Sequence, residues 1–198
     1  MAAAAGGVTS IFDMPNTNPP TIDRDSLAKK KALALEKSIV NYNCFIGATR
    51  DNLEECIKAE NIPGIKVFMG SSTGSLLLDR DEDLDRLFSN GSKLIAVHAE
   101  SESIISENQK MFSWSKNVED HMRIRSVEAA TEAFEKAVYF SNKYKRRLHI
   151  CHLTTQEEAA FLCAQKTDLI SAEVSPHHLF LSAPEVYAQL GVLAQVNP

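Results

Sequence analysis

The stretch Gly64–Gly74, GIKVFMGSSTG, combines an apolar run typical of a buried strand with a loop of small residues. Four apolar side chains surround Lys66, and glycine and serine residues follow them. Because burial of an ammonium group is costly, a lysine inside a core strand is usually paired, neutralised or used in chemistry. We therefore expect Lys66 to have a chemical role. The alternative is an ion-paired lysine, or one whose amine reaches solvent.

Two later apolar runs each carry a histidine near the carboxyl end. They are KLIAVHAE (Lys93–Glu100), which contains His98, and RLHICHL (Arg147–Leu153), which contains His152. Residues at the carboxyl ends of parallel strands meet at one edge of a sheet or barrel. The sequence therefore predicts that Lys66 and these two histidines form one cluster.

The alternation of side chains along a strand separates the histidines into two groups. His152 shares a face with Ile150, and His98 lies on the corresponding face of its own strand. If these faces point toward the cluster, His149 and Cys151 face the covering helices, and we expect them to be packing residues. Opposite faces also argue against Cys151 and His152 as a nucleophile and its base.

Strand-like and helical segments alternate along the whole chain. Strands are expected at 8–13, 42–48, 64–70, 93–100 and 147–153, and a sixth strand with its exit loop at 169–181. Helices are expected at 25–38, 51–60, 81–89, 101–110, 124–144, 155–165 and 184–190, and an inserted loop at 111–122. This alternation predicts a parallel sheet with crossover helices.

Polar loops follow strand after strand, which favours a (β/α)8 TIM barrel, with its site at the carboxyl ends of the strands, over an open sheet. The G-x-G-x-x-G fingerprint of an open dinucleotide-binding sheet does not occur in the sequence. A closed barrel has eight strands and about 250 residues, whereas this chain has 198 residues. We therefore expect a single domain over residues 1–198 with no second domain. It would form about six of the eight βα units of an incomplete barrel and lack the first and last strands.

The overall composition is that of an ordinary globular protein, with 44% hydrophobic residues and a net charge of -5. This charge gives no reason to expect nucleic acid or a membrane as a partner. The opening MAAAAGG lacks the basic segment and apolar core of a signal peptide, so we expect a cytoplasmic protein. The four cysteines include no C-x-x-C pair, which argues against a disulfide framework and a thiolate zinc site.

The predicted cluster suits a divalent metal ion. Neutral imidazole is a good ligand for Zn²⁺, and catalytic zinc sites combine nitrogen and oxygen ligands with an open position for water. A lysine can join such a site after its neutral amine takes up CO₂, because the resulting carbamate is an anion with two oxygens. Strand-end histidines are also often only hydrogen-bonded, and that alternative stays open.

Six segments in this order and spacing resemble the dihydroorotase branch of the amidohydrolase superfamily, the cyclic amidases that also include dihydropyrimidinases and allantoinases. They are MPNTNPP, GIKVFMGSSTG, LIAVHAES, LHICHLTT, SAEVSPHHLFL and AQVNP. The resemblance covers nearly the whole chain. It implies a hydrolase with a (β/α)8 barrel and a binuclear zinc centre. Such an enzyme interconverts N-carbamoyl-L-aspartate and L-dihydroorotate in pyrimidine synthesis.

The resemblance also assigns roles to individual residues. Lys66 matches the lysine that is carboxylated and bridges the metals, and His98 and His152 match metal-binding histidines at the ends of two strands. Asn16 and Asn197 resemble asparagines that bind the small-molecule substrate. A plain turn residue is the alternative for Asn16.

The chain departs from the family pattern at two places. The family's His-x-His pair should precede AAAAGG, and its acid/base aspartate should follow the terminal NP, so no catalytic residue is assigned here. No other H-x-H occurs in the sequence. Three of the family's six protein ligands remain, and we expect a fragment with little or no activity alone. Glu173, His177 and His178 are expected to be supporting or helix-facing residues.

Two rival functions remain open. Another cyclic amidase, a dihydropyrimidinase or allantoinase, would share the same motifs. A non-catalytic homologue would use the barrel remnant to assemble with other subunits, either copies of itself or a complementing chain. Retention of Lys66, His98 and His152 argues against the second rival, since a chain that binds no metal need not keep a buried lysine.

Overall fold

The computed structural model describes residues 1–70, 76–165 and 167–198. Helices alternate with parallel strands, which confirms the predicted α/β class. The main sheet has the strand order β3-β4-β5-β6-β7, and all of its pairings are parallel. Its strands are β3 (Ile46–Gly47), β4 (Ile65–Phe68), β5 (Ile95–His98), β6 (Leu148–Ile150) and β7 (Ile170–Ala172). Strands that are neighbours in sequence are therefore neighbours in space.

A second, two-stranded parallel sheet joins β1 (Ser10–Asp13) to β2 (Asn41–Cys44). The sequence predicted one strand over 42–48, whereas the structure interrupts it at Phe45. The Phe45 amide donates to the Asp13 carbonyl, and two residues on Gly47 aligns with Lys66 of β4. The prediction of a single strand was wrong because the chain changes its pairing partner at this point.

Within the described residues, seven helices lie close to their predicted positions, and three, at Ala2–Ala5, Asp120–Ile124 and Pro176–Phe180, were not predicted. The second of these begins inside the segment 111–122, which was expected to be entirely loop. The helices are α1 (Ala2–Ala5), α2 (Arg24–Lys37), α3 (Leu53–Lys58), α4 (Asp81–Ser89), α5 (Glu102–Met111), α6 (Asp120–Ile124), α7 (Val127–Tyr144), α8 (Gln156–Ala164), α9 (Pro176–Phe180) and α10 (Glu185–Leu190), followed by a 3-10 turn at Gly191–Ala194. The predicted helix over 124–144 is divided at Arg125, and the Ser126 side chain caps α7 by accepting from the Ala129 amide. No helix within the described ranges combines the length and apolar character needed to cross a bilayer.

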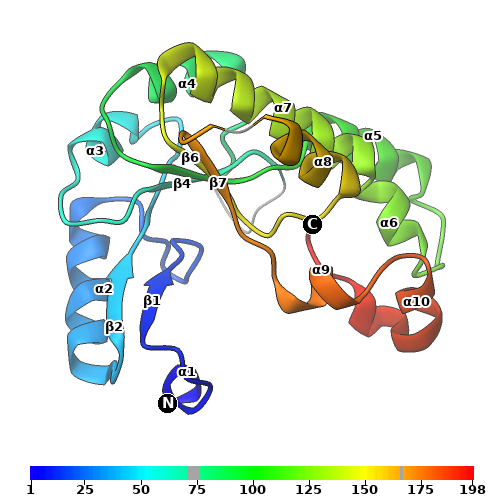
Figure 1. The fold of residues 1–198 in the computed structure, drawn as a ribbon, viewed down its shortest axis with the longest axis horizontal. Coiled ribbons are helices and arrows are strands. Elements are labelled where there is room, and N and C mark those ends of the chain that lie inside the picture. The colour runs from blue at the N-terminus through cyan, green and yellow to red at the C-terminus, as the bar shows by residue number, and fades with distance from the viewer. Residues whose placement is uncertain (71–75, 166) are drawn as a thin grey trace.

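The main core lies between the five-stranded sheet and the helices along its outer side, where α4 and α7 form the upper edge of Figure 1. One face of each strand supplies it, through Ile65 and Val67 of β4 and Ile95 and Val97 of β5, all fully buried. The residues of α7 that meet this face are apolar and small or aromatic, including Ala133, Phe134 and Ala137. Lys66 and His98 therefore belong to the opposite, inner face of the sheet.

The prediction for the faces of β6 was wrong. Leu148 and Ile150 pack in the helix-side core, whereas Cys151 packs on the inner face against Phe45 and Ala96. His149 pairs with Ser171 across the strands and shares the inner face. The error arose because β6 ends at Ile150, so the alternation within the strand does not extend to His152.

Gly70, just beyond β4, is in close contact with the chain after β5. A Cβ atom there would lie 2.6 Å from the Glu100 carbonyl oxygen and 2.7 Å from the Glu100 Cβ. We expect Gly70→Ala to lower the free energy of unfolding by about 2 kcal/mol or more, because backbone must move to accept the methyl group. Urea denaturation measures this change. Gly6→Ala is the control, since its Cβ would meet nothing closer than 3.5 Å; equal losses in the two variants would contradict the expectation.

Candidate metal centre

The three predicted metal ligands come from β4, β5 and the residues just after β6, and they lie in one region. Strand pairing places Phe68 of β4 beside His98 of β5, and Lys66, two residues earlier, beside Ala96. The Lys66 charge acts on the pKa of both His98 and His152, which lie close to it. The structure thus gathers Lys66, His98 and His152 on the inner side of the sheet, as the sequence predicted.

The two imidazoles face each other through defined nitrogen atoms. His98 Nδ1 lies 3.1 Å from His152 Nε2, with the ring centroids 4.8 Å apart. On its other side, His98 Nε2 lies 2.6 Å from a carboxylate oxygen of Glu100. Because a carboxylate only accepts, His98 carries its proton on Nε2, and the lone pair of Nδ1 points toward His152. Metal-binding histidines commonly donate the proton of their second ring nitrogen to a carboxylate in this way.

His152 reaches this position through an unusual backbone. Its φ is 41°, in the left-handed region that non-glycine residues seldom occupy. The Thr154 hydroxyl donates to the His152 carbonyl at 2.7 Å and holds the turn. His152 Nδ1 is buried and has no hydrogen-bond partner among the described residues. Backbone strain of this kind concentrates at functional sites, where it aims a side chain.

Lys66 is almost fully buried, with 2% of its surface exposed. Its Nζ lies 3.3 Å from Cys151 Sγ and 4.7 Å from the centre of the Phe68 ring. Burial lowers the pKa of Lys66, and the Cys151 contact opposes that shift only in part. The neutral amine, the form that can add CO₂, is therefore favoured relative to a lysine in water.

Burial also keeps the two histidines neutral. It lowers the pKa of His98, against the opposing effect of Glu100. It lowers the pKa of His152 to about 3, and the charges of His98 and Lys66 contribute to the shift. Neutral imidazoles have the free lone pair that metal binding requires.

A buried ion pair supports the site from behind. Glu100 is 1% exposed and accepts from both His98 and the Arg125 guanidinium, whose side chain is 9% exposed. Sequence reasoning left Glu100 and Arg125 out of the site. The available signal was H-x-E at the end of β5, since residues two apart lie on the same face of a strand.

The two predicted substrate residues lie outside this cluster. Asn16 follows β1 and is exposed, and Asn197 accepts at 3.0 Å from His121, which also bonds to the Tyr187 hydroxyl at 2.8 Å. Among the described residues neither asparagine hydrogen-bonds to a predicted metal ligand. A cavity of about 520 Å³ lies between α6, α8 and α10, and its wall includes Glu100 and His121. This cavity connects the His121 region to the carboxylate that holds His98.

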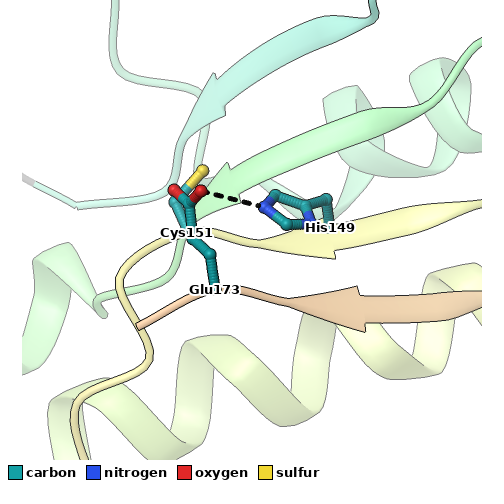
Figure 2. Close-up of side chains that lie close together, drawn as sticks. All are labelled: His149, Cys151 and Glu173. Atoms are coloured by element: carbon teal, nitrogen blue, oxygen red, sulfur yellow. Dashed lines mark ion pairs between the residues drawn. The ribbon is translucent and has the colours of Figure 1, made fainter. Parts of the chain in front are cut away.

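Glu173 and the two histidines that follow β7 lie in different surroundings. Glu173 Oε2 lies 3.5 Å from His149 Nε2, so that Glu173 belongs to the inner face, as Figure 2 shows. His177 and His178 lie in the short helix α9 and both bond to the Ser175 hydroxyl. Their expected supporting role stays a prediction.

Comparison with known proteins identifies relatives over the whole chain. No family model matches the sequence. The dihydroorotase of Methanosarcina mazei is 32% identical over 100% of this chain and 46% of that protein, and the dihydroorotase of Methanosphaera stadtmanae is 34% identical over the same shares. The chain is similar to these dihydroorotases along its whole length. It spans about half the length of the curated relatives that it matches.

One solved structure is also similar to the whole chain. The L-hydantoinase (dihydropyrimidinase) of Arthrobacter aurescens superposes with a TM-score of 0.92 at 26% identity, over 100% of this chain and 46% of that one. The expected resemblance to cyclic amidohydrolases is confirmed by both kinds of comparison.

The donor atoms of His98 and His152 are spaced to suit a zinc ion. Donor atoms in a tetrahedral zinc site lie about 3.3–3.8 Å apart, and His98 Nδ1 and His152 Nε2 are already 3.1 Å apart. The buried, unpartnered Nδ1 of His152 allows that ring to carry its proton on Nδ1 and direct the Nε2 lone pair to the same point as His98. Lys66, if carboxylated, would add an anionic oxygen ligand.

Removal of Arg125 tests the support behind His98. We expect Arg125→Ala to lower the free energy of unfolding by about 3 kcal/mol, since it leaves the buried Glu100 carboxylate without its cation. The surface variant Arg86→Ala breaks only an exposed pair with Glu54 and should cost about 0.5 kcal/mol. Urea denaturation compares the two. Addition of Glu100→Gln to Arg125→Ala should restore part of the loss, and strictly additive losses would contradict a coupled pair.

Acid should destabilise the metal-free protein through His152. In the unfolded chain this histidine takes up a proton near pH 6.5, whereas its pKa of about 3 keeps it neutral in the folded chain. Stability from this group is therefore complete well above pH 6.5 and is lost as the pH falls toward 3, by on the order of 5 kcal/mol. Denaturation at several pH values in the presence of a chelator measures the slope. His152→Gln should flatten it, and an unchanged slope would contradict this origin.

Proposed function

We propose that this chain is the zinc-binding part of a dihydroorotase-type cyclic amidohydrolase, an enzyme that interconverts N-carbamoyl-L-aspartate and L-dihydroorotate. The observation that carries the proposal is the pair of facing nitrogens, His98 Nδ1 and His152 Nε2, 3.1 Å apart beside the buried amine of Lys66. A site used only for packing would not need two neutral imidazoles and a desolvated lysine together.

The architecture in this proposal is a TIM barrel, of which the described strands form a part. Five parallel strands in sequential order, with helices along the outer side, are the arrangement that such a barrel repeats. The inner face of the sheet, which carries Lys66, His98 and Cys151, would then be the barrel interior. The carboxyl ends of the strands would form the mouth where a small-molecule substrate binds.

The residues of this chain would act in distinct ways at that mouth. The neutral amine of Lys66 attacks CO₂ and releases a proton, so that a carbamate replaces the amine. His98 and His152 would hold Zn²⁺ with this carbamate, and Glu100 orients His98 through the proton on Nε2. When bound, zinc lowers the pKa of water and polarises an amide carbonyl. Asn16 and Asn197 would bind substrate, and small displacements would be needed to free Asn197 from His121.

Hydantoin and dihydropyrimidine rings are the second substrate class to consider. The high structural similarity to an L-hydantoinase (dihydropyrimidinase) favours this candidate, whereas the sequence relatives are dihydroorotases. Both candidates use the same cyclic amide chemistry, so the metal ligands are common to them. Assays of a longer form of the protein on dihydroorotate, hydantoin and dihydrouracil would distinguish them.

Zinc affinity tests the ligand assignment without relying on turnover. In a Cys151→Ser background, which removes the thiol beside Lys66, we expect one zinc ion per chain by calorimetry and elemental analysis. His98→Gln, His152→Gln and Lys66→Ala should each weaken zinc binding at least tenfold. Lys116→Ala, at an exposed position, should leave it unchanged.

Two results would overturn the proposal. Equal zinc affinity in all these variants would show that the three residues are not ligands. Because the sequence contains no His-x-His pair, we also expect little hydrolysis of dihydroorotate by the 198-residue chain. Turnover that is abolished by chelation but insensitive to Lys66→Ala would contradict the proposed role of the lysine.

A further inference from the structure

A second group of side chains of metal-ligand type lies on the inner face at β6 and just beyond β7, beside the cluster described above. His149, Cys151 and Glu173 direct one nitrogen, one sulfur and one carboxylate oxygen to a common region, and these atoms all lie within 4.8 Å of one another (Figure 2). His149 and Cys151 are two apart in sequence and share a face, and Glu173 lies beyond β7, next to the end of β6. We propose that these three residues form a separate site for a thiophilic divalent cation, Zn²⁺ or Cd²⁺.

The distances are close to those of a formed site. Zinc bonds of about 2.0–2.3 Å place tetrahedral donors about 3.3–3.8 Å apart. His149 Nε2 and Glu173 Oε2 already lie 3.5 Å apart. The most distant pair among the three donors would move by about 1 Å to reach this range. Three protein ligands would leave one position open for water.

The hydrogen bonds of His149 favour a cation between the ring and Glu173. Its Nδ1 lies 2.9 Å from the Ser171 hydroxyl, and that hydroxyl can itself donate to the Leu148 carbonyl at 3.5 Å. When Ser171 donates to Leu148, it must accept the Nδ1 proton of His149, which leaves Nε2 as an acceptor. Two acceptors, Nε2 and the Glu173 carboxylate, then face each other and require a proton or a metal ion between them.

The exposure of the three side chains increases from the sulfur to the carboxylate, so that a cation could enter from the carboxylate side. Cys151 is 3% exposed, the His149 side chain 21% and the Glu173 side chain 55%. A cation would therefore first meet the exposed carboxylate, and the sulfur would hold it at the buried end. A thiolate and an imidazole select soft or borderline ions, whereas Mg²⁺ and Ca²⁺ prefer oxygen ligands.

The site shares no ligand with the Lys66, His98 and His152 cluster but touches it. Cys151 Sγ lies 3.3 Å from Lys66 Nζ. A cation bound by this sulfur replaces the thiol proton and places positive charge beside the amine of Lys66. The second site would therefore compete with any chemistry that needs an uncrowded Lys66.

Cadmium titration tests the proposal, because a thiolate bound to Cd²⁺ gives a charge-transfer absorption in the ultraviolet that imidazole and carboxylate ligands do not give. The starting protein is Cys163→Ser, which removes the exposed cysteine. We expect the thiolate band of this protein to reach its maximum with one Cd²⁺ bound through sulfur, whatever further Cd²⁺ binds at the first cluster without giving a band. Cys151→Ser in this background should lose the band. His149→Gln and Glu173→Gln should each weaken the binding that the band reports at least tenfold.

Matched variants separate this site from the neighbouring one. His98→Gln removes a ligand of the first cluster and should leave the cadmium–thiolate band and its affinity unchanged. Glu173 is exposed, so Glu173→Gln keeps the test valid even where Cys151→Ser disturbs folding, which circular dichroism would reveal. Absence of the band in the starting protein, its persistence in Cys151→Ser, or unchanged affinity in both His149→Gln and Glu173→Gln would each overturn the proposal.

Discussion

The buried carboxylate of Glu100 is the contact on which the arrangement of the site depends. A charge that is 1% exposed must be matched by donors, and here they come from His98 at the end of β5 and Arg125 between α6 and α7. The backbone of the same residue fills the space beside Gly70 at the end of β4. Glu100 thereby links the ends of β4 and β5 to the start of α7. The helical pattern breaks at Arg125 because this residue turns its side chain to the buried carboxylate.

Within the strands, simple alternation explains which residues face the helices. The helix-side core contains Ile65, Val67, Ile95 and Val97. Lys66 and His98 alternate with these residues and lie on the other face. The same rule fails beyond Ile150, because the chain leaves the strand and His152 adopts a φ of 41°. Side-chain alternation could not assign His149 and Cys151 to the correct face, because the prediction extended it from the strand to His152. The strand has only three residues, and the sequence pattern does not show where it ends.

Much of the element order could be predicted from the sequence. Helix α4 matches its predicted bounds, and every predicted strand segment contains a strand. Lys66, His98 and His152 were found because each stands out chemically within an apolar run. Glu100, Arg125 and the Lys66–Cys151 contact were not, because they depend on pairing between distant segments. Residues 71–75, part of the loop predicted after β4, lie outside the described residues.

The inner face of the sheet has a common electrostatic character. Burial lowers the pKa of Lys66 and of both neighbouring histidines, and it raises the pKa of the Cys151 thiol. All four shifts favour the uncharged form. The buried carboxylate on this face, Glu100, is paired with Arg125. The face therefore carries several neutral donors whose lone pairs are expensive to protonate. A metal ion satisfies such donors without protonating them, because it replaces the thiol proton and uses the free lone pairs of the imidazoles. Desolvation by the fold thus makes this face a poor place for isolated charges, and it keeps the donor atoms in the neutral forms from which a cation would bind.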